Sequence, residues 1–158
     1  MTWPHILYLA PVVPAAVLGV SDFRRRSIPV GWLVAFGLCV LSRAAVLSPL
    51  TEMLYHIVTN TLLLGWMLGG VWLYLRLRYG RQANLFRRSV GSGDLVFAVL
   101  LTPLAPLPQY LLLLLGGCLA GLAYWIGVRT AVRRSATIPL VTFLSLAFMV
   151  CTLYRLIR

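Results

Sequence analysis

The 158-residue sequence has only three acidic residues, Asp22, Glu52 and Asp94, and it has no lysine. Charged residues make up 11% of the chain, hydrophobic residues make up 61%, and the mean hydropathy is +0.92. Soluble domains carry about 25% charged residues, so this composition excludes an ordinary soluble protein. Stretches without charge that approach the roughly 20 residues needed to cross a bilayer fill most of the sequence. We therefore predict an all-α polytopic membrane protein.

Several site types are also missing from the sequence. The cysteines Cys39, Cys118 and Cys151 stand alone within apolar segments, without the paired spacing of a zinc site or a disulfide framework. No P-loop or dinucleotide-binding fingerprint is present. We therefore expect no metal site and no cofactor. The first apolar run lacks the basic start and the small-residue cleavage signal of a secretory signal peptide, so we interpret it as a retained helix.

All fourteen basic residues are arginines, and they give the chain a net charge of +11. A strongly basic chain can bind nucleic acid, but these arginines fall in short clusters between apolar runs. Such clusters orient membrane proteins, because cytoplasmic loops are enriched in positive charge. This rule places eleven arginines on the cytoplasmic side and three near the outer face. We therefore expect a lipid bilayer around the chain and no nucleic-acid partner.

Six transmembrane helices are predicted from the apolar runs and the breaks between them. They are expected at about 4–20, 29–47, 53–75, from 95 to a turn at Pro103, Pro106 and Pro108, from that turn to 128, and at 138–154. Both termini then lie outside the cytoplasm, although Arg155 and Arg158 at the outer side run against the positive-inside rule. No repeat or linker is visible, so residues 1–158 are expected to form one domain.

Two of the three acidic residues are predicted to lie at the same membrane border. Asp22 follows the first apolar run and precedes Arg24, and Asp94 opens the fourth run directly after a glycine-rich turn. A carboxylate at this depth is costly and commonly functional. Two structural alternatives stay open at this point. Asp94 could cap the start of its own helix, and Asp22 could pair with the arginines that follow it.

The sequence around both aspartates resembles a known family. The segment from Asp22 to Ile28 and Pro29 is similar to the D-x5-I-P segment of bacterial type IV prepilin peptidases. Gly91, Ser92, Gly93 and Asp94 resemble the GxGD motif of the same family, and Ile138 and Pro139 resemble a proline-containing stretch in its last helix. The resemblance extends over essentially the whole chain. It departs from the family at Val30, where asparagine is usual, and in lacking the cysteine-containing insert of the long members.

The resemblance implies an intramembrane aspartyl endopeptidase of the bacterial cytoplasmic (inner) membrane, with its active site facing the cytoplasm. Asp22 and Asp94 would be the catalytic residues, one ionised and one protonated, and we expect Asp22 to be the ionised one because Arg24 is near. The substrate would be a prepilin or pseudopilin of a pilus or secretion system, cut at the border between its basic leader and its apolar helix. The reaction needs water, so a wet cavity is expected at the aspartates. Methyltransferase activity is not expected without the insert.

Other functions remain compatible with the same residues. A non-enzymatic assembly component or a small transporter could use Asp22 and Asp94 as polar anchors or proton carriers. A transporter is expected to have repeated halves or acids near the middle of the bilayer, which this sequence lacks. A presenilin-like protease could share the GxGD element, but the D-x5-I-P segment favours the prepilin branch. The sequence leaves the oligomeric state open.

Overall fold

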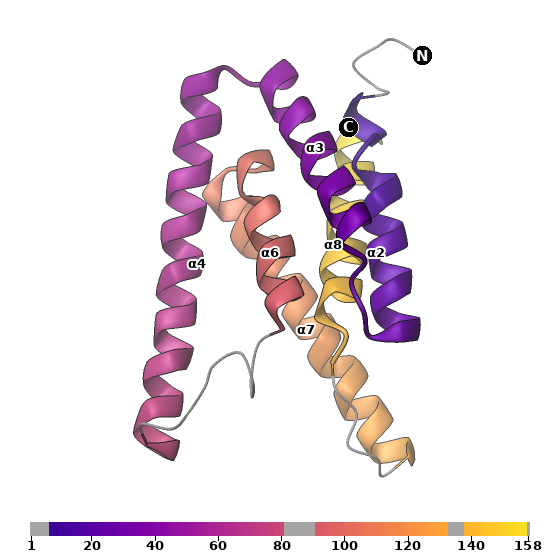
Figure 1. Cartoon of the computed structure of the whole chain (residues 1–158), viewed down its shortest axis with the longest axis vertical. Helices are drawn as coiled ribbons and strands as arrows, with labels where there is room; N and C mark the ends of the chain where they lie inside the picture. Colours follow the sequence, from indigo (N-terminus) through magenta and orange to yellow (C-terminus); the bar gives the residue numbers. More distant parts are fainter. Residues whose placement is uncertain (1–6, 81–90, 133–137, 158) are drawn as a thin grey trace.

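The computed structural model describes residues 7–80, 91–132 and 138–157, and within these ranges it consists of helices joined by short links, without a strand. The described residues form six α-helices and one short 3₁₀ turn, η1, and Figure 1 shows how the helices are arranged. The elements are α2 (Val12–Arg25), α3 (Val30–Leu47), α4 (Leu50–Tyr79), α6 (Ser92–Leu100), η1 (Thr102–Leu104), α7 (Leu107–Val132) and α8 (Leu140–Ile157). The predicted all-α architecture is confirmed.

Four helical segments are long and apolar enough to cross a membrane. They are Leu7–Arg25, Val30–Leu47, Leu50–Tyr79 and Leu107–Val128. The apolar segments Ser92–Leu104 and Leu140–Leu156 are shorter. These lengths support a polytopic membrane protein. The segments at α6 and α8 are shorter than the roughly 20 residues that an upright crossing of a bilayer needs.

Helix α8 occupies the centre of the bundle, packed along α2 on one side and α7 on the other (Figure 1). Glycines permit both close approaches. A side chain at Gly19 of α2 would collide with the hydroxyl of Ser145, and a Cβ at Gly117 of α7 would lie 2.7 Å from Leu144. Small residues at helix contacts are typical of membrane proteins. Lipid tails are as apolar as the side chains, so the hydrophobic effect does not drive helices together, and close van der Waals packing of the backbones does so instead. Glycine positions thus fix α8 between its neighbours.

Three phenylalanines join α3, α6 and α8 below the surface. The rings of Phe36 and Phe97 stack with centroids 4.8 Å apart, and Phe148 meets Phe36 edge-on at 5.8 Å. All three side chains are buried. Aromatic pairs in these geometries stabilise a contact by about 0.5–1.5 kcal/mol beyond the area that they bury. This cluster holds α6 in register with α8, which is the contact that matters for the aspartates.

The predicted proline turn after the fourth apolar run is confirmed as η1. Two buried polar side chains hold it in place. Asn60 of α4 donates from Nδ2 to the carbonyl oxygens of Thr102 and Ala105, each at 2.8 Å, and the Tyr110 hydroxyl donates to the Ala98 carbonyl at 3.0 Å. A chain break inside an apolar environment leaves backbone groups that must be paired by protein. Asn60 therefore ties α4 to the turn by binding those groups.

The observed helix limits differ from several of the predicted spans. The α4 helix is longer at both ends than the predicted 53–75, and the first helical segment continues to Arg25, beyond the predicted end at 20. Asp22 therefore lies in the last turn of α2 and not beyond the helix. Helix α3 begins one residue after the predicted start and ends at the predicted Leu47.

Candidate active site

A reversal of the chain after α2 determines where Asp22 and Ile28 lie. Arg26 adopts a left-handed conformation with φ 54°, and its N–H binds the Asp22 carbonyl at 3.1 Å, which ends the helix. The Ser21 hydroxyl donates to the Ser27 carbonyl at 2.9 Å and folds the link back. Pro29 then precedes the first turn of α3, where a fixed φ suits helix entry. The D-x5-I-P segment is therefore a helix end, a reversal and a helix start.

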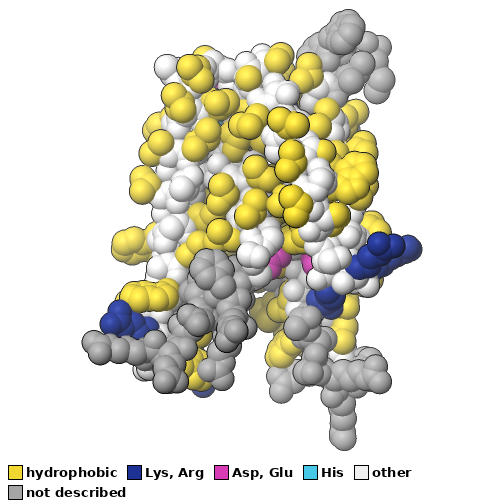
Figure 2. All heavy atoms as spheres, in the orientation of Figure 1, with side chains coloured by type: hydrophobic (Ala, Val, Ile, Leu, Met, Phe, Trp, Pro, Cys, Tyr) yellow, Lys and Arg dark blue, Asp and Glu magenta, His cyan; other side chains and the backbone are white. Residues whose placement is uncertain are grey.

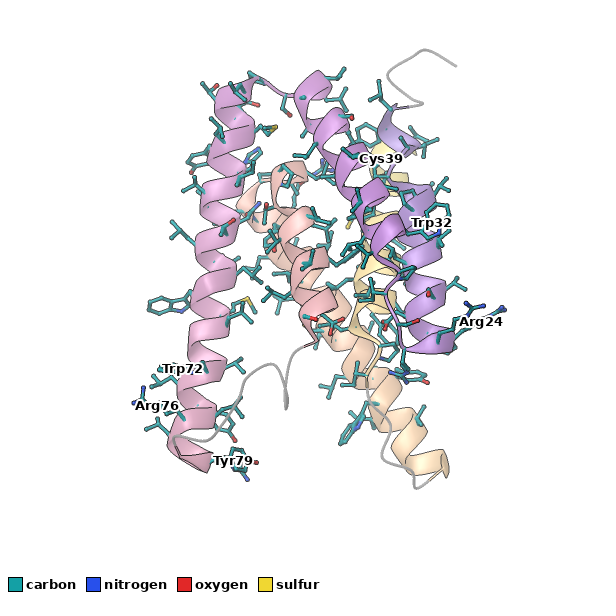
Figure 3. All side chains as sticks on the ribbon, in the orientation of Figure 1. Arg24, Trp32, Cys39, Trp72, Arg76 and Tyr79 are labelled. Carbon is teal, nitrogen blue, oxygen red and sulfur yellow. The ribbon has the colours of Figure 1, made fainter. Side chains whose placement is uncertain are left out.

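The Asp22 side chain points from α2 to α8. It is only 8% exposed. Its Oδ2 accepts the backbone N–H of Thr142 at 3.2 Å and lies 3.3 Å from the Thr142 hydroxyl, which also lies 2.9 Å from the Gly19 carbonyl. Arg24, the first arginine after Asp22, points away from the helical body (Figure 3). The observed hydrogen-bond partner of Asp22 is thus Thr142 of α8, and Arg24, one of the arginines of the ion-pair alternative, points elsewhere.

Asp94 is the third residue of α6, so it is not the N-cap residue that the capping alternative proposed. Gly91 is the N-cap residue, without a side-chain cap bond. The Asp94 carboxyl group instead reaches back to the N–H of Gly91 and also accepts the N–H of Val141 in α8. A Cβ at Gly91 would lie 2.8 Å from Asp94 Oδ2, so the glycine leaves room for the carboxyl group.

The first turn of α8 brings Asp22 and Asp94 together. Val141 and Thr142 are consecutive, with Cα atoms about 3.8 Å apart, and each donates its N–H to one of the two carboxyl groups. N–H groups in a first helical turn lack partners within the helix, and the helix dipole favours negative charge there. The two carboxyl groups are close enough for their charges to interact. We call Asp22 and Asp94 the aspartate pair.

Figure 2 shows acidic side chains at the lower rim of the helical body on the drawn face, close to one another. Helices α4 and α7 extend past this level in the same direction (Figure 1). The arginine-bearing ends of α2 and α4, marked by Arg24 and Arg76 in Figure 3, also lie toward this end. Both aspartates thus lie toward the arginine-bearing end of the bundle, as the sequence predicted.

The other motif residues surround the aspartate pair. Gly93 is packed against the Ile28 side chain so closely that a Cβ at Gly93 would collide with Ile28 Cδ1. Pro139 is fully buried before the first turn of α8, and Ile138 lies against Gly121 of α7. Ser92 is exposed at the start of α6. The three segments that carry the resemblance therefore meet at one place, although they are far apart in the sequence.

A groove of about 550 Å³ lies beside the link between α2 and α3. Its lining includes Ser21, Arg24, Pro29 and Trp32, but neither member of the aspartate pair. The wet cavity expected at the aspartates therefore stays a prediction. Among the described residues, no group of three or more histidine, cysteine or acidic side chains could hold a metal ion.

Sequence reasoning missed Thr142, although its backbone and hydroxyl position Asp22. A single threonine in an apolar run gives no signal of such a role, because the contact joins residues 120 positions apart. It also missed Asn60 and Tyr110, which hold η1 and α6 in place. Comparison of the chain with known protein families, curated proteins and solved structures finds no match.

Proposed function

We propose that this chain is an intramembrane aspartyl endopeptidase that removes the basic leader of a prepilin or pseudopilin at the cytoplasmic membrane border. The observation that carries the proposal is the junction at α8, where consecutive N–H groups bind Asp22 and Asp94. These two acids come from separate helices, and aspartyl catalysis needs two carboxyl groups close enough to share one proton.

The proposed chemistry uses one carboxylate and one carboxylic acid. The ionised aspartate takes a proton from water while the water oxygen attacks the scissile carbonyl carbon. The protonated aspartate gives its proton to the carbonyl oxygen. The tetrahedral intermediate then collapses and the C–N bond breaks. The departing amine receives the proton that the first aspartate took from water, and a hydroxyl group of the intermediate returns a proton to the second aspartate, which restores the starting protonation of the pair. Like charges at close range do not both ionise cheaply, so burial and proximity favour this unequal protonation.

Thr142 has a positioning role in this mechanism. Its N–H and hydroxyl group hold Asp22 from one side, and the Gly19 carbonyl shares the hydroxyl. The N–H of Gly91 holds Asp94 through the turn of the GxGD segment. Backbone donors at both carboxyl groups limit their rotation, and limited rotation lowers the cost of reaching the reactive geometry.

The choice of substrate rests on the motifs and on charge. The D-x5-I-P and GxGD segments resemble those of enzymes that cut prepilins, and they lie together around the aspartate pair. A basic leader approaching Arg24 and Arg25 meets repulsion, because these side chains are exposed. Docking therefore depends mainly on contacts between the substrate helix and the apolar helices, with anionic headgroups screening the charges.

A second candidate is a non-enzymatic membrane component in which the aspartates are polar anchors. The same junction favours it, because each aspartate accepts an N–H from the first turn of α8 and so acts as a cap supplied by another helix. This role needs an acceptor oxygen at each position but no exchangeable proton. The two candidates therefore differ in what an asparagine at these positions can do.

Replacement of each aspartate by asparagine separates the candidates. Asp22→Asn and Asp94→Asn keep a side-chain oxygen that can accept the α8 N–H but remove the acid–base chemistry. Each variant is co-expressed with prepilins and pseudopilins, and leader removal is followed by gel shift. The peptidase proposal requires both variants to insert normally and to leave the substrate uncut.

Glu52→Gln is the matched control, because Glu52 is the third acidic residue, is exposed, and begins α4 at the opposite end of the bundle. It should process substrate as the unchanged chain does. Normal cleavage by either aspartate variant would reject the aspartyl mechanism. If the unchanged chain also leaves every tested prepilin and pseudopilin uncut, the result would favour the anchor role.

A further inference from the structure

A buried arginine lies at the end of the bundle opposite the aspartate pair. Arg43 of α3 is only 4% exposed. One of its guanidinium nitrogens donates to the Tyr8 carbonyl at 3.2 Å, and the guanidinium group stacks over the Tyr8 ring at 3.7 Å from its centroid. These contacts fix the orientation of the side chain, but neither partner carries a negative charge. The positive charge of Arg43 is therefore buried without an acidic partner among these contacts.

A second arginine shares the space next to Arg43. Arg155 lies in the last turn of α8, and the charges of the two guanidinium groups interact unfavourably. Both line a cavity of about 210 Å³, together with Tyr8 and Ser48. Both also line a smaller cavity of about 30 Å³ that extends toward Tyr110. Two like charges thus face one polar cavity.

Ordinary roles explain only part of this arrangement. A basic residue at a helix C-terminus interacts favourably with the helix dipole, which accounts for Arg155. Arginines near a membrane border can also extend to the headgroups, but Arg43 is too deeply buried to do so. A buried charge is costly unless an opposite charge pairs with it. Neither cavity is lined by an aspartate or glutamate among the residues that the structure describes.

We propose that Arg43 and Arg155 bind a phosphate group in this cavity. Guanidinium groups present planar pairs of donors that match phosphate oxygens. The two guanidinium groups also carry positive charge, and no aspartate or glutamate among the described lining residues balances it. The volume is below the ~300 Å³ lower limit of pockets for drug-sized ligands, so it suits a small oxyanion. The phosphate belongs either to a lipid headgroup or to free phosphate. The negative charge of a bound phosphate also offsets the positive charge of Arg43 and Arg155. These arginines lie at the end of the bundle where the positive-inside rule predicts few basic residues.

The test measures thermal unfolding of the full chain in detergent as ligand is added. Three additives are compared: phosphatidylglycerol, diacylglycerol with the same acyl chains, and inorganic phosphate. We expect phosphatidylglycerol or inorganic phosphate to raise the unfolding temperature and diacylglycerol to leave it unchanged. A shift with phosphatidylglycerol alone identifies a lipid headgroup, and an equal shift with inorganic phosphate identifies the free ion.

Arg155→Gln localises the site, because Arg155 is exposed and its replacement leaves the bundle core intact. We expect about tenfold weaker binding in this variant, since one charge-assisted hydrogen-bonding partner is lost. Arg43→Lys keeps the charge but loses the planar donors, and it should weaken binding similarly. Arg24→Gln, at the other end of the bundle, is the control and should bind as the unchanged chain does.

Three outcomes would overturn the proposal. The first is no response to phosphatidylglycerol and inorganic phosphate. The second is an equal response to diacylglycerol, which would assign the effect to the acyl chains. The third is unchanged binding in Arg155→Gln, which would place the phosphate at other arginines. None of these results bears on leader cleavage, which depends on the aspartate pair.

Discussion

Asp22 accepts a hydrogen bond from the backbone N–H of Thr142 at 3.2 Å, across 120 positions of the chain. The contact joins the last turn of α2 to the first turn of α8. The Val141 N–H, one residue earlier, binds Asp94 of α6. One helix start thus serves as the meeting point of both acids.

Thr142→Val should reduce cleavage while keeping the backbone N–H that binds Asp22. The variant loses the hydroxyl that lies near Asp22 Oδ2 and the Gly19 carbonyl. We expect the free energy of unfolding to fall by about 1 kcal/mol and kcat to fall more than KM changes. Thr142→Ser retains the hydroxyl and should restore most of the activity. Equal kinetics for the valine and serine variants would exclude a positioning role for the hydroxyl.

Aspartate-to-alanine variants should be less stable than aspartate-to-asparagine variants. Alanine removes the oxygen that accepts the first-turn N–H, whereas asparagine keeps an acceptor of similar size. Loss of a capping acceptor costs about 0.5–2 kcal/mol. Unfolding in detergent should therefore rank Asp22→Asn above Asp22→Ala. The same order is expected at Asp94, and a reversed order at both positions would contradict the capping geometry.

Leader cleavage should depend on pH with a bell-shaped profile. As the pH falls, the ionised aspartate takes up a proton and no longer activates water. As the pH rises, the protonated aspartate loses its proton and no longer polarises the carbonyl. The two limbs belong to the pair and not to either residue alone. Initial rates of leader removal in proteoliposomes test this, and a rate that rises steadily across the whole range would disagree with the shared-proton mechanism.

Gly93→Ala should destabilise the junction of α6 with the loop before α3. The added Cβ collides with Ile28 Cδ1, and overpacking of this kind costs about 1–3 kcal/mol. Ile28→Val removes that terminal carbon, so the double variant should recover much of the lost stability. Gly116→Ala of α7 is the control, because a Cβ there meets nothing within 4 Å. A double variant no more stable than Gly93→Ala would assign the defect to the backbone.

Asn60→Ala should loosen α4 from η1. It leaves the Thr102 and Ala105 carbonyl groups without their donor inside the protein, at a cost of about 1–3 kcal/mol. Thr59→Ala is the neighbouring control, since the Thr59 hydroxyl binds carbonyl groups of its own helix. Thermal unfolding in detergent compares the two variants. Similar losses in both would show that Asn60 has no special role.

The sequence was enough to predict the helical class, the limits of α3 to within one residue, and the proline turn. It also predicted that the two aspartates lie at the same end of the bundle. Each follows from a local pattern: apolar run length, proline, or the sign of nearby charge. The hydrogen bonds of Asp22 were not predictable, because Thr142 looks like any threonine in an apolar helix. The role of Asn60 was not predictable for a similar reason, because its partners Thr102 and Ala105 lie 42 and 45 positions further along the chain.

The shared helix start also determines how changes at the two aspartates combine. Each carboxyl group restrains the same first turn of α8 through an adjacent peptide N–H. When one restraint is removed, that turn can move toward the other acid, so the second removal acts on an altered geometry. The free-energy costs of single substitutions at 22 and 94 should therefore not sum to the cost of the double substitution, which makes the two positions one thermodynamic unit.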